Sequence, residues 1–145
     1  MHMSRKSTIP KNSKVYLDKS YVQLYWNPTL KIIVCRWSGF CTHEEISAVA
    51  LCLMDIVHLE GAKKILYDSQ DMEVLDDASQ KFISGAFTKQ MIKAGVEYSA
   101  TVFPEDIFAK FAVADIRKSM TNIKESNNST FDSMKSALAW LKKKG

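Results

Sequence analysis

A long helix flanked by two strand-like segments is the feature that most restricts the fold of this chain. Thr42 and Glu45 form a capping-box pattern at its start, and Gly61 is a suitable terminator at its end. Strand-like residues 30–37 precede the helix and residues 62–67 follow it, with short connections on both sides. This order is typical of a β-α-β crossover. The sequence therefore predicts two parallel strands in one sheet, covered by this helix.

The other segments extend the same sheet. Residues 21–26 alternate like a half-buried strand, and a turn at Asn27-Pro28-Thr29 joins them to residues 30–37 as an antiparallel hairpin. The next predicted elements are a helix from Asp76 or Asp77 to Gly95, with a buried stripe that includes Ala78 and Ala86, and a strand over 96–103. They are followed by a helix from about Glu105 to Met120 and by a last helix capped by Asp132 or Ser133. Residues 121–130 are ambiguous, with room for a short edge strand. We expect an α/β fold: a single mixed β-sheet led by an antiparallel N-terminal hairpin and packed by about four helices.

Length and charge indicate one domain with a basic arm. The chain has 145 residues, the usual size of a single domain, and 46% of them are hydrophobic. Residues 1–19 contain five basic side chains and one acidic one, a balance that equals the net charge of +4 of the whole chain. We expect residues 1–19 to form a flexible basic arm and residues 20–145 to form a single α/β domain. The folded part has no basic excess, which argues against nucleic-acid binding.

No segment of the sequence has the character of a membrane span or a signal peptide. The longest apolar stretch, residues 46–59, is interrupted by Asp55 and His58. The three cysteines form no C-x-x-C pair, which argues against a disulfide framework. We therefore expect a cytoplasmic protein without a membrane span.

The sequence lacks the common signatures of enzymes. Its five glycines are scattered and form no phosphate-binding loop, and neither G-x-S-x-G nor H-E-x-x-H occurs. Cys41 and His43 stand two residues apart at a helix start, where side chains rarely face each other. We expect no catalytic residue, no metal and no cofactor, and hence a protein that is not an enzyme.

The most distinctive polar segment is acidic and is predicted to be a loop over residues 68–77. Its carboxylates belong to Asp68, Asp71, Glu73, Asp76 and Asp77. Because the loop would follow a parallel strand, these groups could hold Mg²⁺ or Ca²⁺. Capping of the next helix already explains the last two acids, so a solvated loop is the better interpretation.

Two of the predicted helices have more apolar residues than one buried face requires. The surplus residues are Leu51 and Cys52 in the first helix, and Ile107, Phe108 and Phe111 in the third. A small domain has too little mass to cover both sides of several helices. We therefore expect these residues to form a partner or ligand surface.

Several segments in this order resemble a known family. They are a Tyr/Trp-rich first hairpin followed by IIVCRWSGF, KKILYDSQDMEVL, VEYSATVFPEDIF and FDSMKSALAWLKKK. From Tyr21 to Lys143 the chain resembles the STAS/SpoIIAA-like family, relatives of sporulation-type anti-sigma-factor antagonists, in its stand-alone, Bacteroidetes-type form. The resemblance implies a β-first sheet with about four helices, protein–protein binding, and commonly a homodimer.

The resemblance also implies a place for a phosphorylation switch. Members of the wider family carry a phosphorylatable Ser or Thr in an Asp-Ser-Ser/Thr-Gly stretch at a helix start. The nearest segment here runs from Asp68 through Ser69 to Asp71, lacks the glycine, and lies several residues before the next helix. A phosphate on Ser69 would meet neighbouring carboxylates, an unfavourable setting. These residues are therefore interpreted as a degraded phospho-switch loop.

Three classes of function follow. The first is a non-enzymatic protein-interaction or regulatory domain that acts as a homodimer or with a protein partner. The alternative is a small-molecule or lipid binding or sensing domain with an apolar pocket near the helix over 105–120, supported by a fold-level analogy to Sec14-type lipid-binding domains. An enzyme that uses the acidic segment with a divalent metal ranks third.

Overall fold

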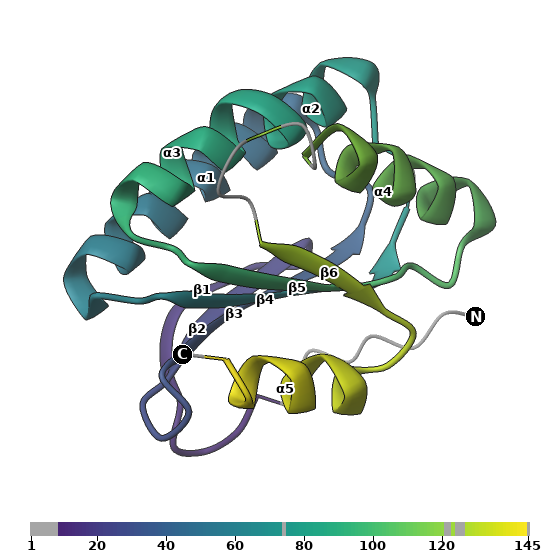
Figure 1. Cartoon of the computed structure of the whole chain (residues 1–145). Helices are drawn as coiled ribbons and strands as arrows, with labels where there is room; N and C mark the ends of the chain where they lie inside the picture. The colour runs from purple at the N-terminus through teal and green to yellow at the C-terminus, as the bar shows by residue number, and fades with distance from the viewer. Residues whose placement is uncertain (1–8, 74, 121–122, 124–126, 145) are drawn as a thin grey trace.

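The computed structural model describes residues 9–73, 75–120, 123 and 127–144, which contain one six-stranded sheet (Figure 1). Its strands, in sheet order, are β1 (Lys14–Asp18), β2 (Val22–Asn27), β3 (Ile32–Gly39), β4 (Lys64–Met72), β5 (Tyr98–Val102) and β6 (Asn128–Phe131). β1 pairs antiparallel with β2, and β2 pairs antiparallel with β3, whereas β3, β4, β5 and β6 run parallel to one another. The sheet is therefore mixed, with an antiparallel N-terminal part, and the predicted α/β fold class is confirmed.

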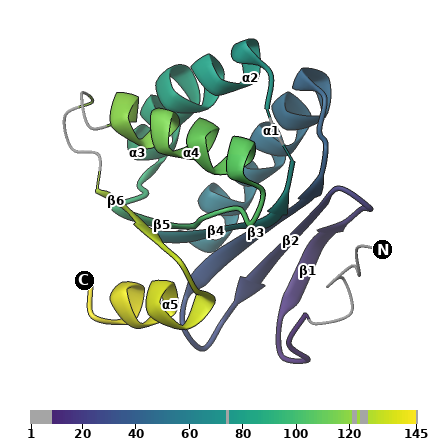
Figure 2. The ribbon, with the colours of Figure 1, turned by 90° about the vertical axis from the view of Figure 1, so that its right-hand side faces the viewer.

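Helices cover both faces of the sheet, but unequally (Figure 2). On one face lie α1 (His43–Glu60), α2 (Asp77–Phe82), the π-helical segment η2 (Ile83–Phe87), α3 (Thr88–Ala94) and α4 (Ile107–Met120). The opposite face carries α5 (Met134–Lys142). Within the described residues, none of these helices is both long enough and apolar enough to cross a bilayer.

β3 shows how one sheet builds two cores. Ile33, Cys35 and Trp37 belong to the core beneath α1, whereas Ile32 and Val34 belong to the core beneath α5. All five side chains are buried. Because successive residues of a strand point to opposite faces, a strand covered on both sides has a nearly continuous apolar sequence. The apolar run in this segment therefore marks a central strand.

The N-terminal arm is shorter than predicted, because the sheet already begins at Lys14. β1 pairs with β2, with Val15 opposite Tyr25 and a bulge before Leu17. Its few apolar residues stand among lysines and an aspartate, and the bulge breaks their alternation, so the sequence pattern was that of an arm. Mixed charges of this kind suit an edge strand. Residues 1–8 of the predicted arm lie outside the described residues.

The ends of α1 confirm their predicted capping. The N–H of Glu45 donates to Thr42 Oγ1 at 3.1 Å, and the N–H of Thr42 donates to Glu45 Oε1 at 2.9 Å. At the other end Gly61 has a φ of 62°, a left-handed conformation that glycine adopts without steric cost. The capped helix joins β3 to the parallel strand β4 as the predicted crossover.

β4 is longer than predicted, and the loop expected over residues 68–77 is wrong in its first half. Arg36 lies opposite Asp68, and Ser38 lies opposite Asp71, with one extra residue in β4, a bulge, between the two pairs. Aspartate is disfavoured in strands by intrinsic propensity. Here the acidic side chains meet Arg36 on the neighbouring strand, and this contact outweighs the propensity.

The helix predicted to end at Gly95 is present, but a π-helical turn interrupts it. α2, η2 and α3 follow one another without a break, and Gly95 ends the segment with a φ of 117°. The predicted buried stripe is wrong at Ala78 and Ala86, which are exposed, whereas Ser79 and Thr88 are buried. A π-turn contains one more residue than an α-turn and therefore changes which residues share a face.

Candidate functional site

The acidic residues of β4 face Arg36 rather than solvent. Arg36 Nε lies 3.6 Å from Asp68 Oδ2, and Arg36 Nη2 lies 3.8 Å from Asp71 Oδ2. None of the three residues is more than 8% exposed. Asp68 Oδ1 also accepts hydrogen bonds from the backbone and side-chain N–H groups of Gln70, at 3.1 Å and 3.0 Å. Buried charges require such pairing because their desolvation is costly, so this cluster is part of the packed interior.

Ser69, the residue of the predicted phospho-switch, lies in the same strand and is 3% exposed. Its side chain lines a cavity on the helix-covered face of the sheet. The nearest following helix, α2, begins only at Asp77. The phospho-switch at Asp68, Ser69 and Asp71 therefore stays a prediction, and phosphorylation there would require β4 to open locally.

The remaining acids of the predicted loop do not gather around a common point. Asp76 Oδ1 accepts the N–H of Ser79 at 2.7 Å and so caps α2. This hydrogen bond lowers the pKa of Asp76 below its ordinary value. Glu73 and Asp77 are exposed. Within the described residues, no three His, Cys, Asp or Glu side chains are grouped so that they could hold a metal ion.

Cys41 and His43 have different neighbours. The Cys41 thiol donates to the carbonyl of Tyr21 with an S···O distance of 3.8 Å, whereas His43 Nδ1 lies 3.3 Å from Ser79 Oγ. Burial raises the pKa of Cys41 to about 12. The thiol is therefore protonated at neutral pH, whereas a nucleophilic cysteine must form a thiolate.

α4 has apolar residues on two faces, as predicted. Its inner face buries Ala109, Ala112, Val113 and Ile116. On its outer face Ile107, Phe108 and Phe111 are 60%, 70% and 62% exposed, and we call these three residues the α4 patch. Residues three and four apart share one side of a helix, so the three side chains form one surface.

The two predicted surface residues of α1 do not join the α4 patch. Leu51 is 70% exposed, whereas Cys52 is half-buried against the core. α1 connects β3 to β4, and α4 connects β5 to β6, with the α2–η2–α3 segment between them in the chain and in contact with both. The five predicted residues therefore belong to two separate surfaces.

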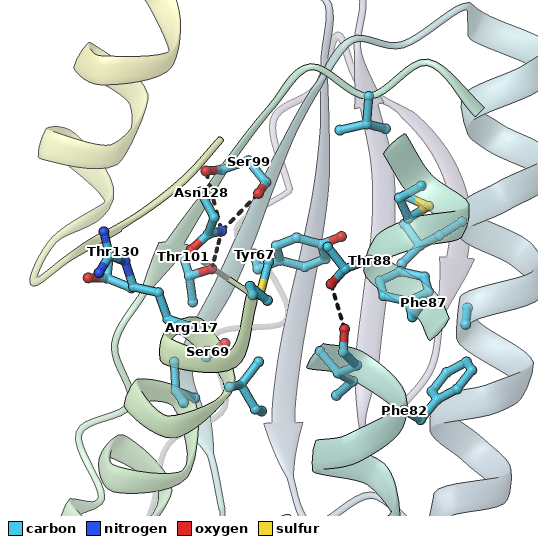
Figure 3. Close-up of a pocket in the computed structure, with 18 of the residues that line it drawn as sticks. Tyr67, Ser69, Phe82, Phe87, Thr88, Ser99, Thr101, Arg117, Asn128 and Thr130 are labelled. Atoms are coloured by element: carbon cyan, nitrogen blue, oxygen red, sulfur yellow. Dashed lines mark hydrogen bonds between the residues drawn. The ribbon is translucent and has the colours of Figure 1, made fainter. Parts of the chain in front are cut away.

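A cavity of about 100 Å³ lies between the sheet and the helices on its first face (Figure 3). Most of the helical side chains that form its roof are apolar, and they include Ile83, Phe87, Met91, Val113, Ile116 and Met120. Most of the side chains that β4, β5 and β6 contribute to its floor are polar, and Met72 of β4 is an apolar exception; the polar ones include Tyr67, Ser69, Ser99, Thr101, Asn128 and Thr130. A parallel sheet covered by helices is normally rich in Val, Ile and Leu, so a hydroxyl-rich floor is unusual.

Asn128 organises the polar floor of the cavity. Its Nδ2 donates to Ser99 Oγ at 2.8 Å and to Thr101 Oγ1 at 3.3 Å. Parallel pairing of β5 and β6 brings these residues together, with Ser99 opposite Asn128 and Thr101 opposite Thr130. Sequence reasoning missed this group, because β6 falls in the ambiguous segment 121–130. The alternation of polar residues in Ser99-x-Thr101 and Asn128-x-Thr130 was the available signal.

Arg117 and Tyr67 are among the ionisable side chains that line the cavity. Arg117 extends from α4 toward Thr130, and its buried Nε has no hydrogen-bond partner within the described residues (Figure 3). Tyr67 comes from β4, and burial raises the pKa of its hydroxyl, which is therefore neutral. The cavity combines an apolar roof, a floor of hydroxyl and amide groups, and one permanent positive charge.

Comparison with known proteins identifies structures that share this fold. No protein-family model and no curated protein sequence matches this chain. The NMR structure of the protein TM1081 matches with a TM-score of 0.57 and 17% identity, over 79% of this chain and 84% of that one. The anti-sigma factor antagonist SpoIIAA in its unphosphorylated form matches with a TM-score of 0.53 and 14% identity, over 79% of this chain and 91% of that one. The Bacillus cell fate determinant SpoIIAA in its phosphorylated form matches with a TM-score of 0.50 and 14% identity, over 83% of this chain and 98% of that one. Sequence identities this low show a shared fold and no more: the chain has the SpoIIAA-like, or STAS, fold.

Proposed function

We propose that this chain is a non-enzymatic regulatory domain of the cytoplasm that binds protein through the α4 patch, first of all a second copy of itself. The α4 patch is the observation that carries the proposal, since three large apolar side chains adjoin one another on one exposed helix face. Contiguous exposed apolar surface is typical of interaction sites. The fold supports the regulatory part, because SpoIIAA, which shares it, is an anti-sigma factor antagonist.

The size of the patch limits the strength of this interaction. Burial of the exposed parts of Ile107, Phe108 and Phe111 would contribute roughly 3–6 kcal/mol, at the usual value for large apolar side chains. Association costs about 4–15 kcal/mol in lost freedom of motion. The patch alone is therefore too small for a permanent complex. We expect it to be the centre of a reversible interface whose rim supplies further contacts.

Phe108→Asp tests this function. Sedimentation velocity between about 1 and 200 μM brackets the range expected for a reversible interface. The wild-type chain should pass from monomer to dimer with rising concentration, and the variant should stay monomeric. Leu59→Asp is the matched control, because Leu59 is, like Phe108, a large exposed apolar residue but lies on α1.

Two results together would overturn the proposal. One is a wild-type chain that remains monomeric over the whole concentration range. The other is affinity purification from the native host that recovers the same proteins with Phe108→Asp as with the wild type. Equal dissociation of the dimer by Leu59→Asp and Phe108→Asp would move the interface away from α4.

Small-molecule binding is the second candidate function, and the cavity beneath α4 favours it. Its volume of about 100 Å³ is many times the space that one water molecule needs, about 10–15 Å³. It is smaller than the sites of drug-sized ligands, which start at about 300 Å³. The expected ligand is therefore small. Native mass spectrometry of the purified protein should show a bound small molecule, and its absence would count against this function.

A further inference from the structure

Several polar groups of the cavity can donate hydrogen bonds to a bound molecule. Ser99 Oγ and Thr101 Oγ1 each accept a hydrogen bond from Asn128 Nδ2. Each hydroxyl also has a proton of its own, and neither finds an acceptor among the described residues. The two O–H groups can therefore donate to a molecule in the cavity. Arg117 adds the N–H groups of its guanidinium at the same end of the floor, near Thr130 (Figure 3).

Arg117 also gives this end of the cavity a positive charge. It forms no ion pair within the described part of the chain, and its Nε is both buried and without a hydrogen-bond partner. A buried donor without an acceptor is costly to a fold unless a ligand or water supplies the acceptor. Glu97 is the one carboxylate among the described lining residues, and it is an exposed residue just before β5. The charge of Arg117 therefore remains available to an anion.

We propose that the cavity binds a small carboxylic acid with an apolar body. The carboxylate accepts hydrogen bonds from Arg117 and from the hydroxyls of Ser99 and Thr101, and the hydrocarbon packs against Val113 and Phe87. A planar guanidinium matches a carboxylate in geometry as well as in charge. This inference rests on the second candidate function, small-molecule binding.

Other ligand classes fit the same surfaces less well. A cation would be repelled by Arg117. A hydrocarbon would leave the guanidinium and two hydroxyl donors desolvated without acceptors. A sugar-like molecule would place hydroxyl groups against the apolar side chains of η2, α3 and α4. An acid with an apolar body can pair its carboxylate with the polar groups of the floor and pack its hydrocarbon against the apolar side chains of the roof.

The volume of the cavity sets the size of the acid. An engineered protein cavity of about 150 Å³ accommodates benzene, so about 100 Å³ leaves space for a chain of a few carbon atoms. Butanoate is therefore a suitable probe, with 1-butanol and butylamine as neutral and cationic molecules of nearly the same shape. We expect butanoate to bind at least about tenfold more tightly than either, as measured by titration calorimetry and amide chemical shifts.

Variants of the cavity locate the binding site. Arg117→Gln should weaken butanoate binding by about tenfold or more and remove the preference over 1-butanol. Arg117→Lys keeps the charge and should restore part of that preference. Val113→Phe should fill the cavity and weaken binding of all probes. Lys89→Gln, which removes one charge from the exposed side of α3, is the matched control and should change nothing.

The possible outcomes distinguish the carboxylate assignment from small-molecule binding in general. Equal binding of butanoate and 1-butanol, both weakened by Val113→Phe, would overturn the carboxylate assignment and leave small-molecule binding intact. Failure of all three probes to bind the wild type would overturn both. An unchanged amide spectrum of Arg117→Gln without ligand verifies its fold. Tight butanoate binding by such a folded variant would also overturn the assignment.

Discussion

At the scale of single residues, we expect the charge of the Arg36 side chain to contribute to the stability of the fold. It faces two buried carboxylates, at 3.6 Å and 3.8 Å. Arg36→Met would leave Asp68 and Asp71 buried without their cation. Breaking a buried ion pair on one side typically costs about 3–5 kcal/mol, and we expect a loss of this size in the free energy of unfolding. Urea unfolding followed by circular dichroism measures it.

The triple variant Arg36→Met, Asp68→Asn, Asp71→Asn is the informative control. It removes all three charges at nearly constant shape, so most of the lost stability should return. A loss of less than about 1 kcal/mol in Arg36→Met alone, the size of an exposed pair, would contradict the burial of this cluster.

The cysteines allow a second test at this scale. Burial raises the pKa of Cys41 to about 12 and that of Cys35 well above its ordinary value. A raised pKa keeps a thiol protonated until the pH approaches that value, and only the thiolate reacts readily. At pH 8 iodoacetamide should therefore modify the half-buried Cys52 first, and Cys35 and Cys41 only after unfolding. Mass spectrometry over time measures the order, and equal rates for Cys41 and Cys52 in the folded protein would contradict it.

At the scale of secondary structure, α1 depends on its capping box. Thr42→Ala removes the acceptor for the N–H of Glu45. Loss of such a cap costs about 0.5–2 kcal/mol, and we expect a decrease of that size in unfolding free energy by urea titration. Ser47→Ala, inside the same helix, is the control and should have a smaller effect. An unchanged midpoint for Thr42→Ala would show that packing alone determines the start of α1.

Local chemistry explains which elements could be predicted from the sequence. The ends of α1 depend on Thr42, Glu45 and Gly61, which act within one turn of the chain, and the prediction was correct. The end of β4 depends on Arg36 of a neighbouring strand, so its acidic sequence was interpreted as a loop. The π-turn of η2 has no distinctive residue pattern, and the predicted stripe was correspondingly wrong at Ala78 and Ala86.

The same distinction applies to the candidate sites. The α4 patch could be predicted, because a surplus of apolar residues within one helix is visible in a single segment. The cavity floor could not, because Ser99, Asn128 and Arg117 come from three elements that only the sheet order and the helix crossover bring together. Sites of this kind become visible when β6 is placed beside β5.

At the scale of the whole molecule, the described part of the chain covers the second face of the sheet with one helix. The core on that face consists of residues from β2, β3, β4 and β5, closed by Ala137 and Leu141 of α5, both fully buried. Because the strands of this core also carry the core beneath α1, losing α5 should weaken both. Leu141→Ala tests this dependence, and removal of a buried leucine of this kind costs about 2–5 kcal/mol.

We expect Leu141→Ala to lower the unfolding free energy by that amount in one cooperative transition, seen alike by near-UV and far-UV circular dichroism. Leu138→Ala, on a half-buried position of the same helix, should cost less. If α5 were a detachable appendage, Leu141→Ala would instead produce two separate transitions, with the α1 side of the sheet melting at its original temperature. A single shifted transition would show that both cores fold as one unit around the shared sheet.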